Sequence, residues 1–130
     1  MLNFKRKIST ILVIAFLLGC ACPGNVYASV RGEVSGVLRE RSITGKVTCN
    51  EKGHHLRVKV KYYTKNTLTG DEKENKWSNN AFGNNAQVSI TKVAGYHETM
   101  SYLRVWGYVD GNFKKSVDVD GYGFSTREYW

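Results

Sequence analysis

Apolar and polar residues alternate along much of this chain, which is the period-two pattern of half-buried β-strands. The pattern is clearest in residues 56–64. One face of that segment holds Leu56, Val58, Val60 and Tyr62. The other face holds Arg57, Lys59, Lys61 and Tyr63. A helix would scatter these cations around its circumference. The segment therefore predicts a strand with one core face and one cationic, solvated face.

Five other segments have the composition or the alternation of strands. They are residues 42–49, 86–93, 100–109, 113–119 and 122–130. No long amphipathic helix and no internal repeat accompanies them. About six strands in roughly 100 residues predict an all-β fold, a small antiparallel β-sandwich or barrel. Strand order and register do not follow from this pattern.

Two turns connect these strands in the predicted fold. Asn50–Gly53 suits a hairpin loop before Leu56, and Asp110-Gly111 favours the positive φ angles of a type I′ turn. A hairpin about Asp110-Gly111 pairs Tyr108 with Phe113, Trp106 with Lys115, Arg104 with Val117 and Tyr102 with Val119. That register would place Trp106, Tyr108, Phe113 and Val117 on one face.

Residues 66–85 lack the alternation, because they are rich in Asn and in charged side chains. We expect a long connection here, with a short helix over residues 69–77 as an option. Loops of this length within a compact domain are often functional. Trp77 and Phe82 either pin the connection onto the core or form an exposed contact surface.

The N-terminal segment predicts export. Lys5, Arg6 and Lys7 precede an apolar run over residues 8–18, and Val26-Tyr27-Ala28 follows. This is the layout of a secretory signal peptide, residues 1–28, and the apolar run is too short to span a bilayer. An alternative is a lipoprotein signal at residues 17–20, which would anchor the chain to the cell surface through a lipid on Cys20. We expect cleavage after Ala28 and a secreted, extracellular domain over residues 29–130.

Cleavage after Ala28 changes the charge and cysteine content. Three of the 19 basic residues are removed, which leaves 16 against 11 acidic ones and a net charge of +5. A basic surface favours anionic partners, although solubility alone also accounts for such a charge. Cys49 remains as an unpaired cysteine. It shares a strand face with Ile43 and Val47, so we expect a buried, slow-reacting thiol.

No motif for catalysis is present. The chain has no G-x-S-x-G elbow, no H-E-x-x-H sequence, no phosphate-binding glycine loop and no paired-cysteine zinc pattern. His54 and His55 are adjacent, so on a strand they point to opposite faces and cannot share one metal. We therefore expect no enzymatic activity, no cofactor and no metal.

The remaining feature is an excess of aromatic residues. Residues 29–130 contain three Trp, seven Tyr and three Phe. Interleaved with Lys and Arg, such rings suit contact with sugars, a membrane interface or nucleic acid, although β-propensity also favours Tyr. We expect a non-enzymatic protein that binds anionic cell-wall polymer or lipid, with no specific nucleic-acid partner. The candidate binding residues are Arg57, Lys59, Lys61, Tyr63 and Trp77.

The layout resembles the small secreted bacteriocins of Gram-positive bacteria, the lactococcin-type proteins. The common features are an export signal, a basic β-rich domain of about 100 residues and a terminal aromatic pair, here Tyr129-Trp130. The resemblance implies an antibacterial protein and assigns no residue a role. Two alternatives remain: a secreted module that binds carbohydrate or protein, and a small secreted hydrolase.

Overall fold

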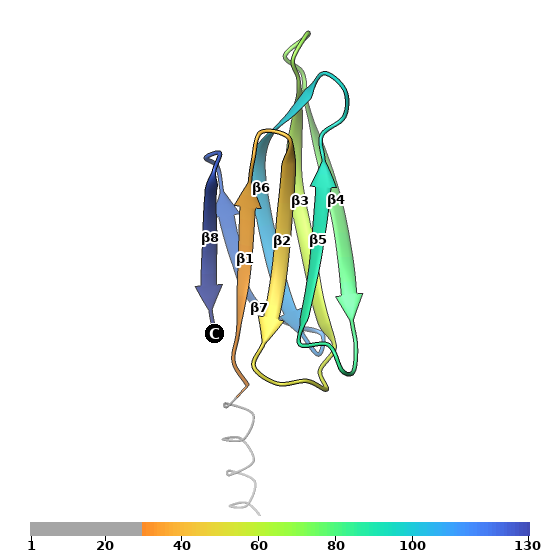
Figure 1. The fold of residues 1–130 in the computed structure, drawn as a ribbon, viewed down its shortest axis with the longest axis vertical. Coiled ribbons are helices and arrows are strands. Elements are labelled where there is room, and N and C mark those ends of the chain that lie inside the picture. The colour runs from red at the N-terminus through yellow and green to blue at the C-terminus, as the bar shows by residue number, and fades with distance from the viewer. Residues whose placement is uncertain (1–29) are drawn as a thin grey trace, which may run out of the picture. The chain divides into compact units, whose positions relative to one another are not determined.

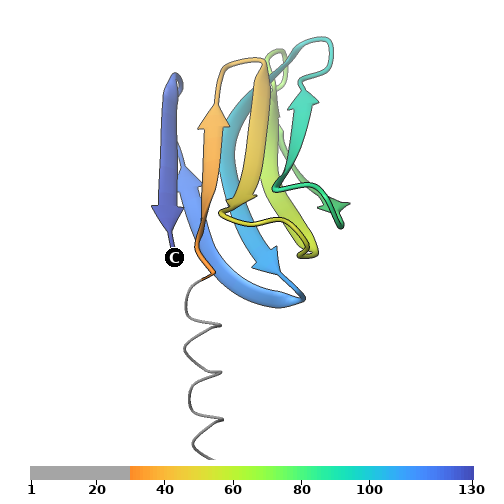
Figure 2. The same ribbon diagram turned by 60° about the horizontal axis from the view of Figure 1, so that its bottom comes forward.

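The computed structural model describes residues 30–130 as eight antiparallel strands and no helix. The strands are β1 (Gly32–Leu38), β2 (Ser42–Cys49), β3 (Leu56–Asn66), β4 (Glu72–Ala81), β5 (Gln87–Val93), β6 (Glu98–Val109), β7 (Asn112–Val119) and β8 (Phe124–Tyr129). They form two four-stranded sheets, ordered β5-β2-β1-β8 and β4-β3-β6-β7, which pack face to face (Figure 1, Figure 2). The predicted all-β antiparallel sandwich is confirmed. The predicted signal peptide, residues 1–28, and Cys20 lie outside the described residues.

The fold has eight strands rather than about six, because the sequence pattern does not predict β1 and β4. β4 occupies most of the segment that was predicted to be a connection or a short helix. It is an edge strand held by backbone pairing with β3 from Leu56↔Ala81 to Lys65↔Glu72. Most of its side chains are exposed. An edge strand stabilised by ladder hydrogen bonds needs no apolar face, so the period-two pattern is absent.

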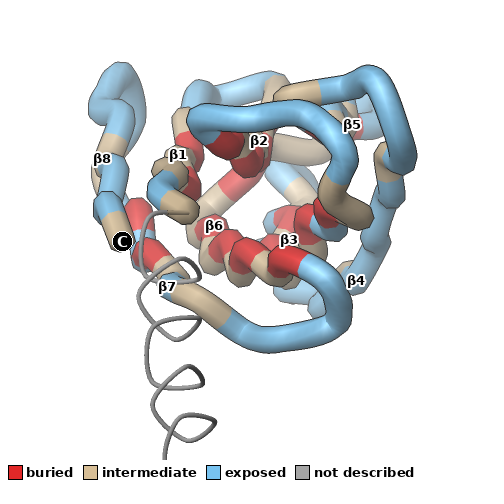
Figure 3. Tube along the Cα trace, turned by 90° about the horizontal axis from the view of Figure 1, so that it is seen from below, coloured by how far each residue is buried: buried red, intermediate tan, exposed pale blue. Residues whose placement is uncertain are grey.

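The core lies between the inner faces of the two sheets, where Figure 3 shows the buried positions facing each other. Its fully buried large side chains are Val34, Leu38, Ile43, Val47, Leu56, Val58, Val60, Met100, Leu103 and Val105. Cys49 is 7 % exposed and belongs to the same face of β2 as Ile43 and Val47, so its predicted burial is confirmed.

Glycines bring the two sheets close together at the centre of the core. A Cβ atom on Gly36 would lie 2.9 Å from Val105 Cγ2, and one on Gly45 would lie 2.6 Å from Val60 Cγ1. Both distances are shorter than ordinary carbon–carbon contact, which is about 3.5–4.0 Å. Glycine is required here because no other residue leaves room for the opposite sheet.

Four connections cross from one sheet to the other. Residues 50–55 link β2 to β3, so the predicted hairpin loop at Asn50–Gly53 is wrong: these two strands lie in different sheets. The connections β4–β5, β5–β6 and β7–β8 also cross. Hairpins within one sheet join β1 to β2, β3 to β4 and β6 to β7.

The β6–β7 hairpin has the predicted turn but a shifted register. Asp110 and Gly111 have φ angles of 50° and 84°, and Tyr108 pairs with Phe113 as expected. An irregularity between Gly107 and Tyr108 then shifts the pairing by one residue, so Trp106 lies opposite Ser116. The predicted pairs of Trp106 with Lys115, Arg104 with Val117 and Tyr102 with Val119 are therefore wrong. A one-residue slip moves side chains to the other face, which places Val117 in the core opposite Val105.

Candidate binding face on the outer side of one sheet

The predicted cation row lies on the solvent side of β3. Leu56, Val58, Val60 and Tyr62 are buried, and the alternate residues Arg57, Lys59, Lys61 and Tyr63 are exposed or half-buried. Four of the five candidate binding residues thus share one face, as the alternation predicts. Alternate residues of a strand lie about 6–7 Å apart, so the three cations form an evenly spaced row.

An aromatic row on β6 lies directly beside the cations. The β3–β6 register pairs Arg57 with Tyr108, Lys59 with Trp106, Lys61 with Arg104 and Tyr63 with Tyr102. We call these eight residues the basic-aromatic face. The row on β6 comes from the even-numbered residues of a segment whose odd-numbered residues enter the core.

Cation–π contacts couple the two rows. Lys59 Nζ lies 5.5 Å from the Trp106 ring centroid and 6.0 Å from that of Tyr108. Arg57 Cζ lies 5.7 Å from the Tyr108 centroid. Tyr63 and Tyr102 have centroids 5.4 Å apart. Such contacts are worth about 0.5–1 kcal/mol at exposed sites, so they bias the flexible cations toward positions over the rings.

The Arg104–Asp118 salt bridge neutralises a cation of β6, whereas the cations of β3 have no acidic partner among the described residues. Arg104 Nη1 lies 3.2 Å from both carboxylate oxygens of Asp118, which also accepts a hydrogen bond of 2.5 Å from the Tyr102 hydroxyl. Burial, followed by this hydrogen bond, raises the pKa of Tyr102, so its hydroxyl stays neutral at ordinary pH. Among the described residues, Arg57, Lys59 and Lys61 form no ion pair.

Trp77 lies on the other side of the sheet. It pairs with Val60, and directly paired residues of two strands point to the same face, which is here the face toward the other sheet. Lys92 Nζ from β5 lies 3.4 Å from the Trp77 ring centroid, and the residue is 50 % exposed at the edge between β4 and β5. The Trp77 ring therefore lies on the opposite face from the other four candidate residues, although Lys59 and Trp77 both line an open recess of about 420 Å³.

Sequence reasoning missed the β6 part of this face. The alternation of residues 100–109 indicates that Trp106 and Tyr108 share one face. The predicted register, however, placed Val117 on that face as well and made it apolar. The true neighbours of these two rings, Lys59 and Arg57, come from a strand about 50 residues earlier. Only the β3–β6 pairing shows this proximity.

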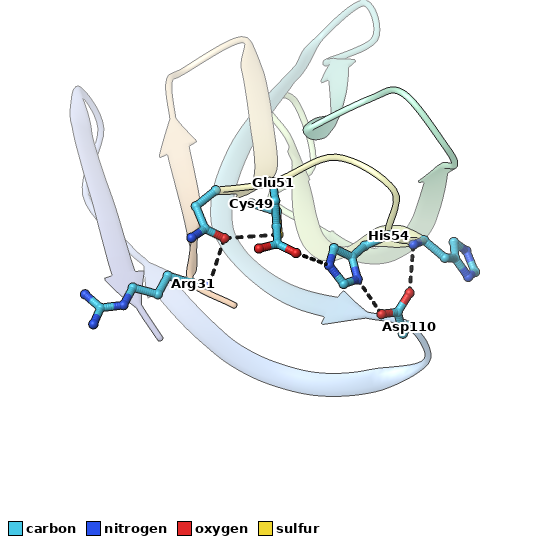
Figure 4. A network of polar contacts seen from close by, with 7 residues as sticks. Arg31, Cys49, Glu51, His54 and Asp110 are labelled. Atoms are coloured by element: carbon cyan, nitrogen blue, oxygen red, sulfur yellow. Dashed lines mark hydrogen bonds and ion pairs between the residues drawn. The ribbon is translucent and has the colours of Figure 1, made fainter. Parts of the chain in front are cut away.

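A polar cluster lies at one end of the sandwich, where the β2–β3 loop meets the β6–β7 turn (Figure 4). His54 Nδ1 is 2.6 Å from Asp110 Oδ2, and its Nε2 is 3.1 Å from Glu51 Oε1. These hydrogen bonds, first to Asp110 and then to Glu51, raise the pKa of His54. The His55 backbone N–H and then the His54 ring lower the pKa of Asp110. The raised pKa of His54 and the lowered pKa of Asp110 both favour an ion pair between these residues, which links the β2–β3 loop to the β6–β7 turn.

His55 points away from this cluster. Its ring is stacked on Phe82 at a centroid distance of 4.2 Å, and its Nε2 lies 3.0 Å from Asn80 Oδ1. The side chains of the two adjacent histidines thus have separate partners, while the His55 backbone N–H also donates to Asp110. Over residues 30–130, no group of three or more His, Cys, Asp or Glu side chains is arranged to hold a metal ion.

A recess of about 510 Å³ lies on the outer side of the other sheet. Hydroxyl side chains line much of it, among them Ser35, Thr44, Ser89 and Ser125. Its charged residues are Lys46 and the ion pair of Glu33 with Arg127, at 3.4 Å. The recess can offer several hydrogen-bonding groups to a polar ligand, and it has little charge to attract an anion.

In comparisons with protein-family models, curated proteins and solved structures, nothing matches the chain. In the part of the chain that the structure describes, no helix is long and apolar enough to cross a membrane.

Proposed function

We propose that this is a secreted, non-enzymatic protein that binds anionic cell-envelope surfaces reversibly through the basic-aromatic face. The anionic partner is cell-wall polymer or the head groups of acidic lipids. The observation that carries the proposal is the row of Arg57, Lys59 and Lys61, which form no ion pair among the described residues and lie beside the rings of β6. An antibacterial role would be one use of such binding.

The physical argument has two parts. The sheet holds three cations at a regular spacing, which suits the repeated charges of a polyanion better than a single phosphate. The neighbouring rings of Trp106 and Tyr108 add apolar contact area, which exposed cations alone do not provide. Each Lys or Arg close to an anionic lipid surface is worth about 1 kcal/mol. Three together therefore account for roughly a hundredfold in affinity.

The test is co-sedimentation of the protein with purified cell wall and with vesicles that contain acidic lipid, over a salt series. The triple variant Arg57→Gln, Lys59→Gln, Lys61→Gln should bind about a hundredfold more weakly than the wild type. Wild-type binding should weaken as salt rises, because the Debye length shortens from about 10 Å at 0.1 M to 3 Å at 1 M.

A matched control separates the face from net charge. Arg31, Arg39 and Lys52 lie away from the basic-aromatic face, and changing all three to Gln removes the same charge. This control should keep most of the binding. An equal loss in both triple variants, or binding that does not depend on salt, would contradict the proposal.

The hydroxyl-lined recess on the outer side of sheet β5-β2-β1-β8 favours a second candidate, a carbohydrate-binding module. Hydroxyl and amide groups on a concave surface can satisfy the hydrogen bonds of a neutral sugar. Binding at this recess would persist at high salt. It would also persist in the variant in which Arg57, Lys59 and Lys61 are changed to Gln. Affinity electrophoresis in gels containing neutral cell-wall polysaccharide would distinguish it from the first candidate.

A further inference from the structure

Two neighbouring loops at one end of the sandwich expose large apolar side chains. The β3–β4 tip, residues 66–71, carries Leu68, which is 71 % exposed. The β5–β6 loop, residues 94–97, carries Tyr96, which is 86 % exposed. Figure 1 shows both loops at the top of the molecule, beyond the β1–β2 hairpin. We call these two loops the paired tips.

Hydrogen bonds join the paired tips to each other. The backbone N–H and the hydroxyl of Thr67 both donate to the His97 carbonyl oxygen, at 2.8 and 3.1 Å. His97 has a φ angle of 61°, which is uncommon for a residue other than glycine, and its ring lies 3.9 Å from that of Tyr96. Leu68 and Tyr96 are therefore presented from one connected unit.

The backbone of the β3–β4 tip satisfies its own donors. Asn66 Oδ1 accepts hydrogen bonds from the N–H groups of Leu68 and Thr69, at 2.8 and 2.9 Å. The Gly70 N–H donates to the Asn66 carbonyl at 2.8 Å, and the Asp71 N–H donates to Thr69 Oγ1 at 3.2 Å. An N–H group that loses water without gaining another acceptor costs several kcal/mol in lipid. These four groups already have acceptors within the tip, so their transfer out of water leaves no unpaired N–H donor among them.

We propose that the paired tips insert into the interfacial layer of a phospholipid bilayer. A protruding Leu supplies apolar area, and Tyr is a side chain that favours the membrane–water interface. Asp71, at the base of the β3–β4 tip, is the one Lys, Arg, Asp or Glu residue in the paired tips, and none occurs in residues 67–70 or 94–97, so insertion does not require acidic lipid. The convex shape of the tips suits a fluid surface, which can close around them, better than a flat protein partner. This inference is independent of the proposed function, because it rests on other residues and a different force.

The experiment is flotation of the full-length mature protein with vesicles of phosphatidylcholine alone, at low salt and at high salt. The wild type should bind at both salt concentrations. Leu68→Asp and Tyr96→Asp should each bind at least about tenfold more weakly, because a charge replaces a side chain whose burial favours the bound state. Leu68→Trp should bind a few-fold more tightly, since indole favours the interface. Both positions are exposed, so none of these changes disturbs the core.

Two controls keep this result separate from binding by the basic-aromatic face. Phe82→Asp adds the same charge at a residue that is 64 % exposed at the opposite end of the sandwich, and it should bind phosphatidylcholine like the wild type. The triple variant of Arg57, Lys59 and Lys61 should also do so. No binding of the wild type to phosphatidylcholine, or equal binding by Leu68→Asp and wild type, would overturn the inference. Neither result would affect the salt-dependent binding to anionic surfaces.

Discussion

Changing Gly45 to Ala should destabilise the fold, because the added methyl group has no space. Its Cβ would lie 2.6 Å from Val60 Cγ1 and 3.0 and 3.3 Å from the two γ-carbons of Val105. Carbon atoms in contact prefer about 3.5–4.0 Å, so Val60 would have to move by about 1 Å. Both valines are completely buried in the opposite sheet. Overpacking of this kind costs about 1–3 kcal/mol of folding free energy. Alanine also lowers the conformational entropy of the unfolded chain, which offsets about 0.4–1 kcal/mol of this cost. We expect a net loss of about 1–2 kcal/mol.

Urea denaturation followed by tryptophan fluorescence measures this loss directly. A double-mutant cycle with Val60→Ala tests its cause. Val60→Ala alone leaves a cavity, but in the Gly45→Ala background it removes the γ-carbon that the new methyl group meets. The double variant should therefore be more stable than the sum of the two single changes predicts. Additive losses, or a Gly45→Ala variant as stable as the wild type, would refute the close approach of the sheets at this point.

Two further predictions concern His54 and Cys49. His54→Gln should lose more free energy of unfolding at about pH 5.5 than at about pH 8.5. Asp110 and Glu51 raise the pKa of His54 above its ordinary value of 6.5, so this contribution is complete below 6.5 and is lost as the pH rises through the folded-state pKa. Urea denaturation at both pH values measures the difference, and an equal loss would contradict the ion pair. The Cys49 thiol should react slowly with a water-soluble disulfide reagent in the native protein and rapidly in urea, since it is 7 % exposed; equal rates would show that it is accessible.

The sequence predicts those strands whose two faces differ in polarity. Residues 42–49 form β2 as predicted, and the predicted strand at 56–64 forms the first nine residues of β3. β1 was missed because Gly36 occupies a core position, where sheet contact requires a glycine and leaves no apolar signal. The shifted β6–β7 register arises from an extra residue in one strand, which changes the geometry without changing the composition.

The candidate site was predictable only within one strand. Alternation alone aligns Arg57, Lys59 and Lys61, because it depends on backbone geometry between near neighbours. The location of Trp106 beside Lys59 depends on the pairing of two strands that are distant in sequence. The sequence pattern predicts a connection around Trp77, and a connection could place this ring beside the cations. Once that segment is a strand paired with β3, its register with Val60 turns the ring to the other side.

The pairing of β1 with β8 has a consequence for the order of folding. Glu33 lies opposite Tyr129, so the first described strand has its outer neighbour near the far end of the chain. Contacts of such sequence separation form slowly, because a long loop must close before they contribute. The sheet β5-β2-β1-β8 can therefore be completed only when almost all of the described residues, from Glu33 to Tyr129, are available for pairing.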